Sequence, residues 1–149
     1  MKKISNFLTE KLKLKSSQYD YHPKDLPELR RIILKEITNN GNDADLNNID
    51  TSAITDMSAL FAPFSEFCGD ISMWNVSNVE KMGEMFYGCE KFNCDISGWD
   101  VSHVTTMREM FFYCKSFNQD LNDWDVSNVK DMYDTFKFTP KLTKPKWYD

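Results

Sequence analysis

The sequence has no apolar run near the roughly 20 residues that a membrane-spanning helix needs. The basic start, Met1-Lys2-Lys3, is not followed by a continuous apolar stretch, so we expect no secretory signal. Gly and Pro number only five each, too few for a low-complexity linker protein. These absences, in a chain of 149 residues, predict one compact soluble domain that is cytoplasmic or virion-associated.

Basic and catalytic side chains are also scarce. The net charge of −5 argues against a nucleic-acid partner. Only two histidines occur, His22 and His103, and the sequence has neither a glycine-rich phosphate loop nor an HExxH motif. Because catalysis needs a nucleophile, a base and an orienting group together, we expect no enzyme, no metal site and no cofactor. The charge divides at Gly41, with a net +4 in residues 1–41 and a net −9 in residues 42–149.

The sequence is rich in internal repetition, with a period of 25 residues that begins at Asn42. Residues 67–79 recur as 92–104 and again as 117–129, without insertion. Four columns are identical in all four copies: Asp45/Asp70/Asp95/Asp120, Ser52/Ser77/Ser102/Ser127, Met57/Met82/Met107/Met132 and Phe61/Phe86/Phe111/Phe136. This chain is therefore a repeat protein.

Each copy combines two apolar patterns. Ile96 to Val104 shows the β-branched enrichment and near-alternation of a short strand. Met107, Met110, Phe111 and Cys114 have the spacing of one helical or 3₁₀ turn. We therefore predict an α/β fold, a short right-handed leucine-rich-repeat-like solenoid of four 25-residue repeats over residues 42–141.

The flanks suit capping segments. Asp25 and Glu28 form a capping box, and Gly41 is a helix stop signal. They predict a helix over residues 26–39 inside an N-terminal cap of residues 16–41. Residues 142–149 are expected to be a C-terminal cap or tail, with Leu142 and Trp147 covering the last repeat.

Residues 1–15 form a basic amphipathic segment. One helical face would carry Ile4, Phe7, Leu8 and Leu12. Three interpretations stay open: a docking peptide for a partner's groove, a segment that lies on an anionic membrane, or a further part of the cap.

The string Asp-Ile-Ser-x-Trp-Asp-Val-Ser-x-Val-x-x-Met-x-x-Met-Phe-x-x-Cys, complete at residues 95–114, resembles the bacterial surface-protein repeat of about 26 residues. That family is related to the BspA-like leucine-rich repeats, and the resemblance covers residues 42–138. It implies a non-enzymatic interaction scaffold, found on cell surfaces and in phage and gut-bacterial proteins, and it supplies no catalytic residues. This chain departs from the family in its 25-residue period, and we expect it to lack the family's usual leader.

Two columns and the four cysteines carry alternative chemistry. The Asp45/Asp70/Asp95/Asp120 column would form a ladder that either caps turns or binds calcium, and we favour turns. The four cysteines lack zinc spacing and are expected to be free thiols. The column of Trp74, Trp99 and Trp124 is expected in the core instead of forming a sugar platform.

A binding surface is expected where the copies vary. Exposed aromatic residues with arginine are typical of protein-interface anchors, although the same residues could pack between neighbouring repeats. The candidate partner-binding residues are Tyr87, His103, Arg108, Phe112, Tyr113 and Tyr133. The sequence thus favours a non-catalytic protein-interaction module with a protein partner. The alternatives are a structural or packaged phage component docked through residues 1–15, and a cell-surface adhesin.

Overall fold

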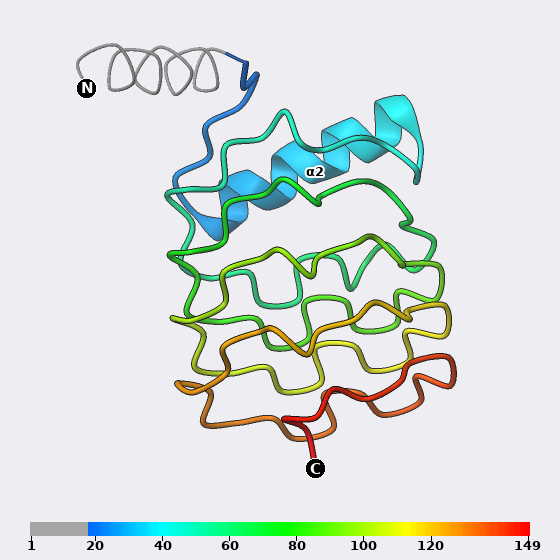
Figure 1. Cartoon of the computed structure of the whole chain (residues 1–149). Helices are drawn as coiled ribbons and strands as arrows, with labels where there is room; N and C mark the ends of the chain where they lie inside the picture. Colours follow the sequence, from blue (N-terminus) through cyan, green and yellow to red (C-terminus); the bar gives the residue numbers. More distant parts are fainter. Residues whose placement is uncertain (1–17) are drawn as a thin grey trace, which may run out of the picture.

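The computed structural model describes residues 18–149, in which one helix lies at one end of a stack of four irregular coils. The coils follow the sequence repeat: coil 1 is residues 42–66, coil 2 is 67–91, coil 3 is 92–116 and coil 4 is 117–141. Figure 1 shows the helix beside coil 1 and the C-terminus at the far end of the stack. The proposed docking peptide, with Ile4, Phe7, Leu8 and Leu12, lies outside the described residues.

The helix, α2, spans Leu26–Asn40 and confirms the prediction for residues 26–39. At its start the Glu28 N–H donates to Asp25 Oδ1 (2.9 Å), and the Lys24 N–H donates to Glu28 Oε2 (2.9 Å). The first bond is the N-cap half of the predicted capping box, and the second joins the Glu28 carboxylate to the residue before the N-cap, Lys24, instead of to Asp25. At its end Gly41 adopts φ 91°, and its N–H donates to the Ile37 carbonyl.

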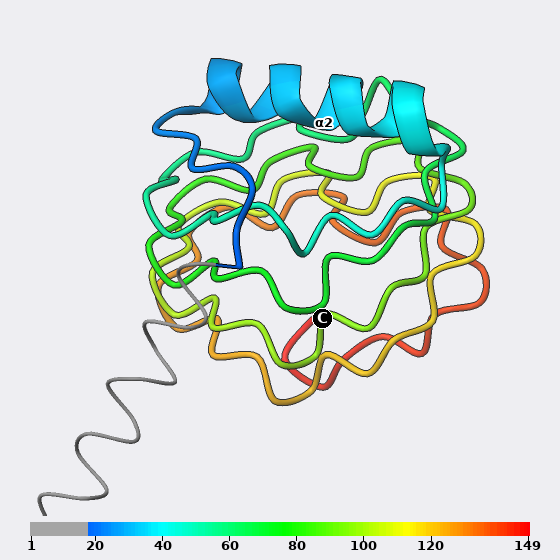
Figure 2. The ribbon, with the colours of Figure 1, turned by 90° about the horizontal axis from the view of Figure 1, so that it is seen from above.

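α2 covers the first coil through one apolar face. Leu29 and Ile33 are fully buried against the core, and the Arg30 guanidinium donates to the Ser58 carbonyl (2.8 Å). Seen from above, α2 runs along one edge of the coils (Figure 2). The preceding residues cover another part of coil 1, because Tyr21 forms a parallel bridge with Ile49.

The coils contain no strand, so the prediction of an α/β leucine-rich-repeat-like solenoid is wrong. Within residues 18–149 the only extended pairing is five isolated parallel bridges, four of them between neighbouring coils. The segment from Ile96 to Val104, predicted to be a strand, is instead two tight turns. In these turns the Trp99 N–H donates to Ile96, and the Val104 N–H donates to Val101. Apolar residues three positions apart suggested a helical turn. Consecutive three-residue turns produce the same spacing in the sequence.

The predicted helical turn near Met107 is a chain of turns with left-handed residues. Glu109 has φ 53° and Tyr113 has φ 62°. These residues reverse the chain so that alternate N–H groups leave the coil and donate to the next one. The donors of coil 3 bond the carbonyls of coil 4 at 2.9–3.0 Å: Met107 to Asp131, Glu109 to Tyr133, Phe111 to Thr135 and Tyr113 to Lys137. The backbone N–H and C=O groups that would pair within a helix or a sheet thus pair between neighbouring coils.

Aromatic columns fill the core. Phe61, Phe86, Phe111 and Phe136 stack at 5.5 Å between successive ring centroids. A second buried column, Phe67, Phe92 and Phe117, stacks beside it. The fourfold identity of the first column follows from this continuous stack, since each ring packs on the copies above and below.

The tryptophan column is in the core, as predicted. Trp74, Trp99 and Trp124 are about 95% buried, and each indole N–H donates to a carbonyl of the preceding coil. Trp147 continues the column, because its indole N–H donates to the Leu121 carbonyl (2.8 Å). The C-terminal segment therefore covers coil 4 as the beginning of a fifth coil would, and Leu142 occupies the Phe117 column one period later.

Candidate functional site: an exposed aromatic stripe

Four aromatic side chains form a surface stripe parallel to the stack. Tyr87 of coil 2 stacks on Phe112 of coil 3, with 4.8 Å between ring centroids and 3° between planes. Phe138 of coil 4 lies edge-on to Phe112 (5.4 Å) and 5.0 Å from Tyr113. We call Tyr87, Phe112, Tyr113 and Phe138 the aromatic stripe. It remains accessible, since 37% of Tyr87, 41% of Tyr113 and 54% of Phe138 is exposed.

Two stripe residues occupy a backbone conformation that suits glycine. Tyr113 has φ 62° and Phe138 has φ 58°, whereas coil 2 places Gly88 (φ 71°) in the same column. A left-handed conformation costs a residue with a Cβ about 1–2 kcal/mol. Coils 3 and 4 thus hold large aromatic side chains at solvent where the smallest residue would fold with less strain.

Arg108 and Tyr133 form a second contact that does not join the stripe directly. The Arg108 guanidinium lies over the Tyr133 ring at 4.5 Å, and it is 3.8 Å from both Glu109 and Asp131. More than half of Tyr133 is exposed. The contacts of the structure therefore join five of the six predicted partner-binding residues into two groups: Tyr87 with Phe112 and Tyr113, and Arg108 with Tyr133.

His103 is the predicted residue that the structure places elsewhere. Its Nδ1 is 2.9 Å from the Ser77 carbonyl, a contact that Asn78 and Asn128 make one coil earlier and later through their amide groups. His103 therefore continues a ladder of hydrogen bonds between coils. None of its contacts in the described residues is with the stripe.

The family of the chain can now be stated. A family model described as "Mycoplasma protein of unknown function, DUF285" matches residues 31–147. The chain belongs to this family. No curated protein and no solved structure matches it.

The DUF285 match spans most of α2, all four coils and most of the C-terminal segment. Nothing in it connects the chain with BspA-like repeats, so that resemblance stays a prediction. No helix in residues 18–149 has the length and apolar character to cross a bilayer.

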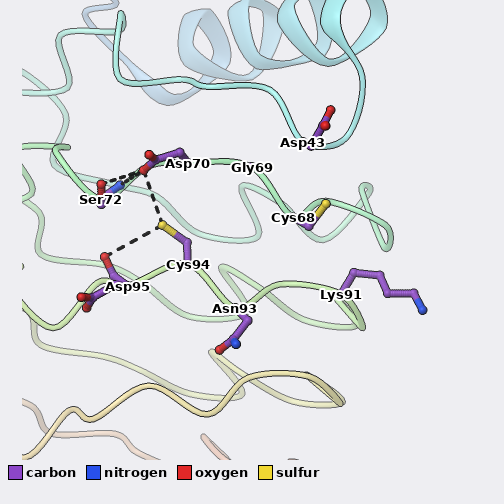
Figure 3. Close-up of a pocket in the computed structure, with 9 residues that line it drawn as sticks. All are labelled: Asp43, Cys68, Gly69, Asp70, Ser72, Lys91, Asn93, Cys94 and Asp95. Carbon is purple, nitrogen blue, oxygen red and sulfur yellow. Dashed lines mark hydrogen bonds between the residues drawn. The ribbon is translucent and has the colours of Figure 1, made fainter.

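A hollow of about 400 Å³ between coils 1, 2 and 3 is the other candidate site (Figure 3). The Cys94 thiol lines the hollow and points to Asp70 Oδ1 at 3.7 Å. Burial and the nearby carboxylates raise the pKa of this thiol, so it stays protonated at neutral pH. Within residues 18–149 no three His, Cys, Asp or Glu side chains converge as a metal site would require. The Cys94 thiol is thus a weak nucleophile, and the residues that line the hollow, which include the exposed Cys68, form no metal-ligand set.

The aspartate column that lines part of this hollow caps turns, as we favoured. Oδ1 of Asp70 accepts the Ser72 N–H (2.9 Å) and the Ser72 hydroxyl (2.6 Å). Asp95 makes the same two bonds with Ser97. These bonds lower the pKa of both carboxyl groups, with the serine hydroxyl as the largest cause.

A second column of turn-capping residues was missed in the sequence. It lies two positions before the conserved serine column, and its side chains accept the serine N–H: Asp50, Asn75, Asp100 and Asp125. The signal was present, because an Asx residue two positions before a serine is the pattern of an Asx turn. Phe138 was also missed, because it follows the last recognisable motif residue, Phe136.

All four cysteines are free, as predicted. Cys89 and Cys114 are buried, and their thiols donate to the carbonyls of Phe61 (3.2 Å) and Phe86 (3.0 Å) of the preceding coil. Burial raises the pKa of Cys89 to about 12. Cys68 alone is exposed, so the thiols serve mainly as core side chains.

Proposed function

We propose that the chain is a non-catalytic protein-interaction module and that the aromatic stripe is its binding surface. The observation that carries this proposal is the exposure of Tyr113 and Phe138 in a left-handed column where Gly88 stands in the neighbouring coil. Backbone strain at exposed positions points to a role other than folding. Exposed aromatic side chains are enriched among interface anchors.

Two further features support a binding surface. Lys115 lies 5.4 Å from the Tyr113 ring and 3.1 Å from Glu90, so the stripe has a polar rim. Stacking between coils holds Tyr87 and Phe112 in place, so little side-chain entropy is lost when a partner binds.

The test compares three forms of the full chain as baits for partner capture from cells of the source organism. The stripe variant carries Tyr113→Gly and Phe138→Gly, which remove both anchors and relieve the strained backbone. The matched control is Met73→Ala, which removes an apolar side chain with 65% exposure from another part of the coils. Captured proteins are identified by mass spectrometry, and circular dichroism checks that each bait is folded.

A protein retained by the wild type and by Met73→Ala, and lost from the folded stripe variant, is the expected result. The proposal is wrong if every captured protein is retained equally by the stripe variant, or if the wild type retains nothing that an empty matrix does not.

A further inference from the structure

The spacing of the stripe restricts the shape of its partner. Tyr87 and Phe112 are 4.8 Å apart, and the phenylalanine column repeats at 5.5 Å. In an α-helix whose axis is parallel to the stack, side chains on one face recur once per turn, about every 5.4 Å. An extended strand presents the same face every second residue, or about every 6.7 Å. Over the two intervals from coil 2 to coil 4, a helix stays in register and a strand drifts by about 2–3 Å.

A row of carboxylates runs beside the stripe. Glu84, Glu109 and Asp134 occupy one column, and each lies three residues before a position at the stripe's edge, Tyr87, Phe112 or Lys137. We call these three residues the carboxylate row. All three have positive φ, between 51° and 57°, as Ala59 has in coil 1 (φ 54°), so this conformation belongs to the turn of every coil and places the three carboxylates at equivalent positions. The Lys137 amine bridges the two features, at 3.1 Å from Asp134 and 5.6 Å from the Phe138 ring.

The carboxylate row is only partly neutralised within the described residues. Asp134 pairs with Lys137, and Glu109 has a longer contact of 3.8 Å to Arg108. Glu84 is exposed and forms no ion pair in residues 18–149. The net charge of −9 in residues 42–149 would draw a cationic partner toward the coils, and the carboxylate row would meet it beside the stripe.

We infer that the stripe binds a basic amphipathic α-helix of a protein partner, with the helix axis parallel to the stack. This inference rests on the proposed function and adds the shape and charge of the partner. One apolar side chain per turn would pack on Tyr87, Phe112 and Phe138. Lysine or arginine residues on the adjoining helical face would meet Glu84, Glu109 and Asp134, which matches the helix-in-groove mode of peptide recognition.

The experiment uses two synthetic peptides of equal length and identical leucine and lysine content. In one, leucine follows the i, i+3, i+4, i+7 helical pattern; in the other, leucine and lysine alternate as in a strand. Both are labelled with fluorescein, and their binding to the full chain is measured by fluorescence anisotropy. The variants are the stripe variant, Glu84→Gln with Glu109→Gln, and Met73→Ala as the control.

We expect the helical-pattern peptide to bind about tenfold more tightly than the alternating peptide, because only it can place apolar residues on three coils. The stripe variant should lose this advantage, the Glu→Gln variant should weaken binding several-fold, and Met73→Ala should do neither. Equal binding of the two peptides, or an advantage that survives in the stripe variant, overturns the inference. If partner capture still depends on the stripe in that case, the proposed function stands and only the helical shape of the partner is wrong.

Discussion

The strain at Tyr113 predicts that glycine is a better residue there than alanine. We compare Tyr113→Gly with Tyr113→Ala, because both changes remove the ring and its contacts with Phe112 and Phe138. Only alanine keeps a Cβ at φ 62°. The lost aromatic contacts therefore cancel in the comparison, and the conformational term remains.

The expected difference in the free energy of unfolding between the two variants combines two opposing contributions. A left-handed conformation costs alanine about 1–2 kcal/mol relative to glycine. Glycine loses about 0.5–1 kcal/mol through the greater freedom of its unfolded chain. The glycine variant should thus be more stable than the alanine variant by about 0.5–1 kcal/mol.

Tyr133 supplies the matched control. It is an exposed aromatic residue of the neighbouring coil and does not have a positive φ. Glycine there should be less stable than alanine by about 0.5–1 kcal/mol, because only the unfolded-state term applies. The sign of the glycine-minus-alanine difference should therefore reverse between positions 113 and 133.

Urea unfolding followed by tryptophan fluorescence measures these differences, since Trp74, Trp99 and Trp124 are buried. The midpoints of the four variants are compared at equal slope. If alanine is as stable as glycine at both positions, Tyr113 is not strained. The argument that the stripe is kept at a cost to folding would then fail.

Three further predictions concern the stack itself. Phe111→Ala should destabilise the fold by about 3–5 kcal/mol, because its ring packs between Phe86 and Phe136; a loss below 1 kcal/mol in urea unfolding would contradict the stacked core. The Ser102 and Ser127 hydroxyls lower the pKa of Asp100 and Asp125, so the stability these carboxylates add is present above pH 3.8 and is lost as the pH falls through the lowered values. Asp100→Asn with Asp125→Asn, which copies Asn75, should lower the melting temperature at pH 7 and show a shallower further loss below pH 3.8, because the amide lacks the stability that the ionised carboxylate adds; equal melting temperatures at pH 7 would contradict this. Iodoacetamide should label Cys68 first in the native chain, and Cys89 and Cys114 only when urea unfolds it; early labelling of Cys114, read by mass spectrometry, would contradict their burial.

The sequence was a good guide wherever one side chain decides the local structure. The capping box of Asp25 and Glu28 located α2 correctly, and Asp70 and Asp95 were correctly favoured as turn residues. The burial of the tryptophan column was also predicted from its fixed place beside valine.

The path of each coil could not be predicted in the same way. It depends on left-handed residues such as Glu84 and Glu109, which carry no glycine signal, and on hydrogen bonds to residues 24 positions later. Apolar spacings of two and three residues suited a strand and a helical turn as well as consecutive turns. The stripe was predicted only in part, because Phe138 occupies a variable position of the repeat, where Gly88 and Tyr113 stand in coils 2 and 3.

The hydrogen bonds between coils also align peptide dipoles along one side of the stack. In residues 57–61, 82–88 and 107–113 the N–H groups that bond another coil all donate to the next one, so these peptide dipoles add, whereas the N–H groups of Glu80, Thr105 and Lys130 donate to the previous coil. At coil 1 the carbonyl groups of this side point away from the stack, and the Arg30 guanidinium, a cation, donates to one of them, the Ser58 carbonyl. At coil 4 the N–H groups of Met132, Asp134 and Phe136 find no carbonyl within residues 18–149. A segment that lengthens the stack there must bring carbonyl oxygens, and a second copy meeting coil 4 face to face would oppose donor to donor.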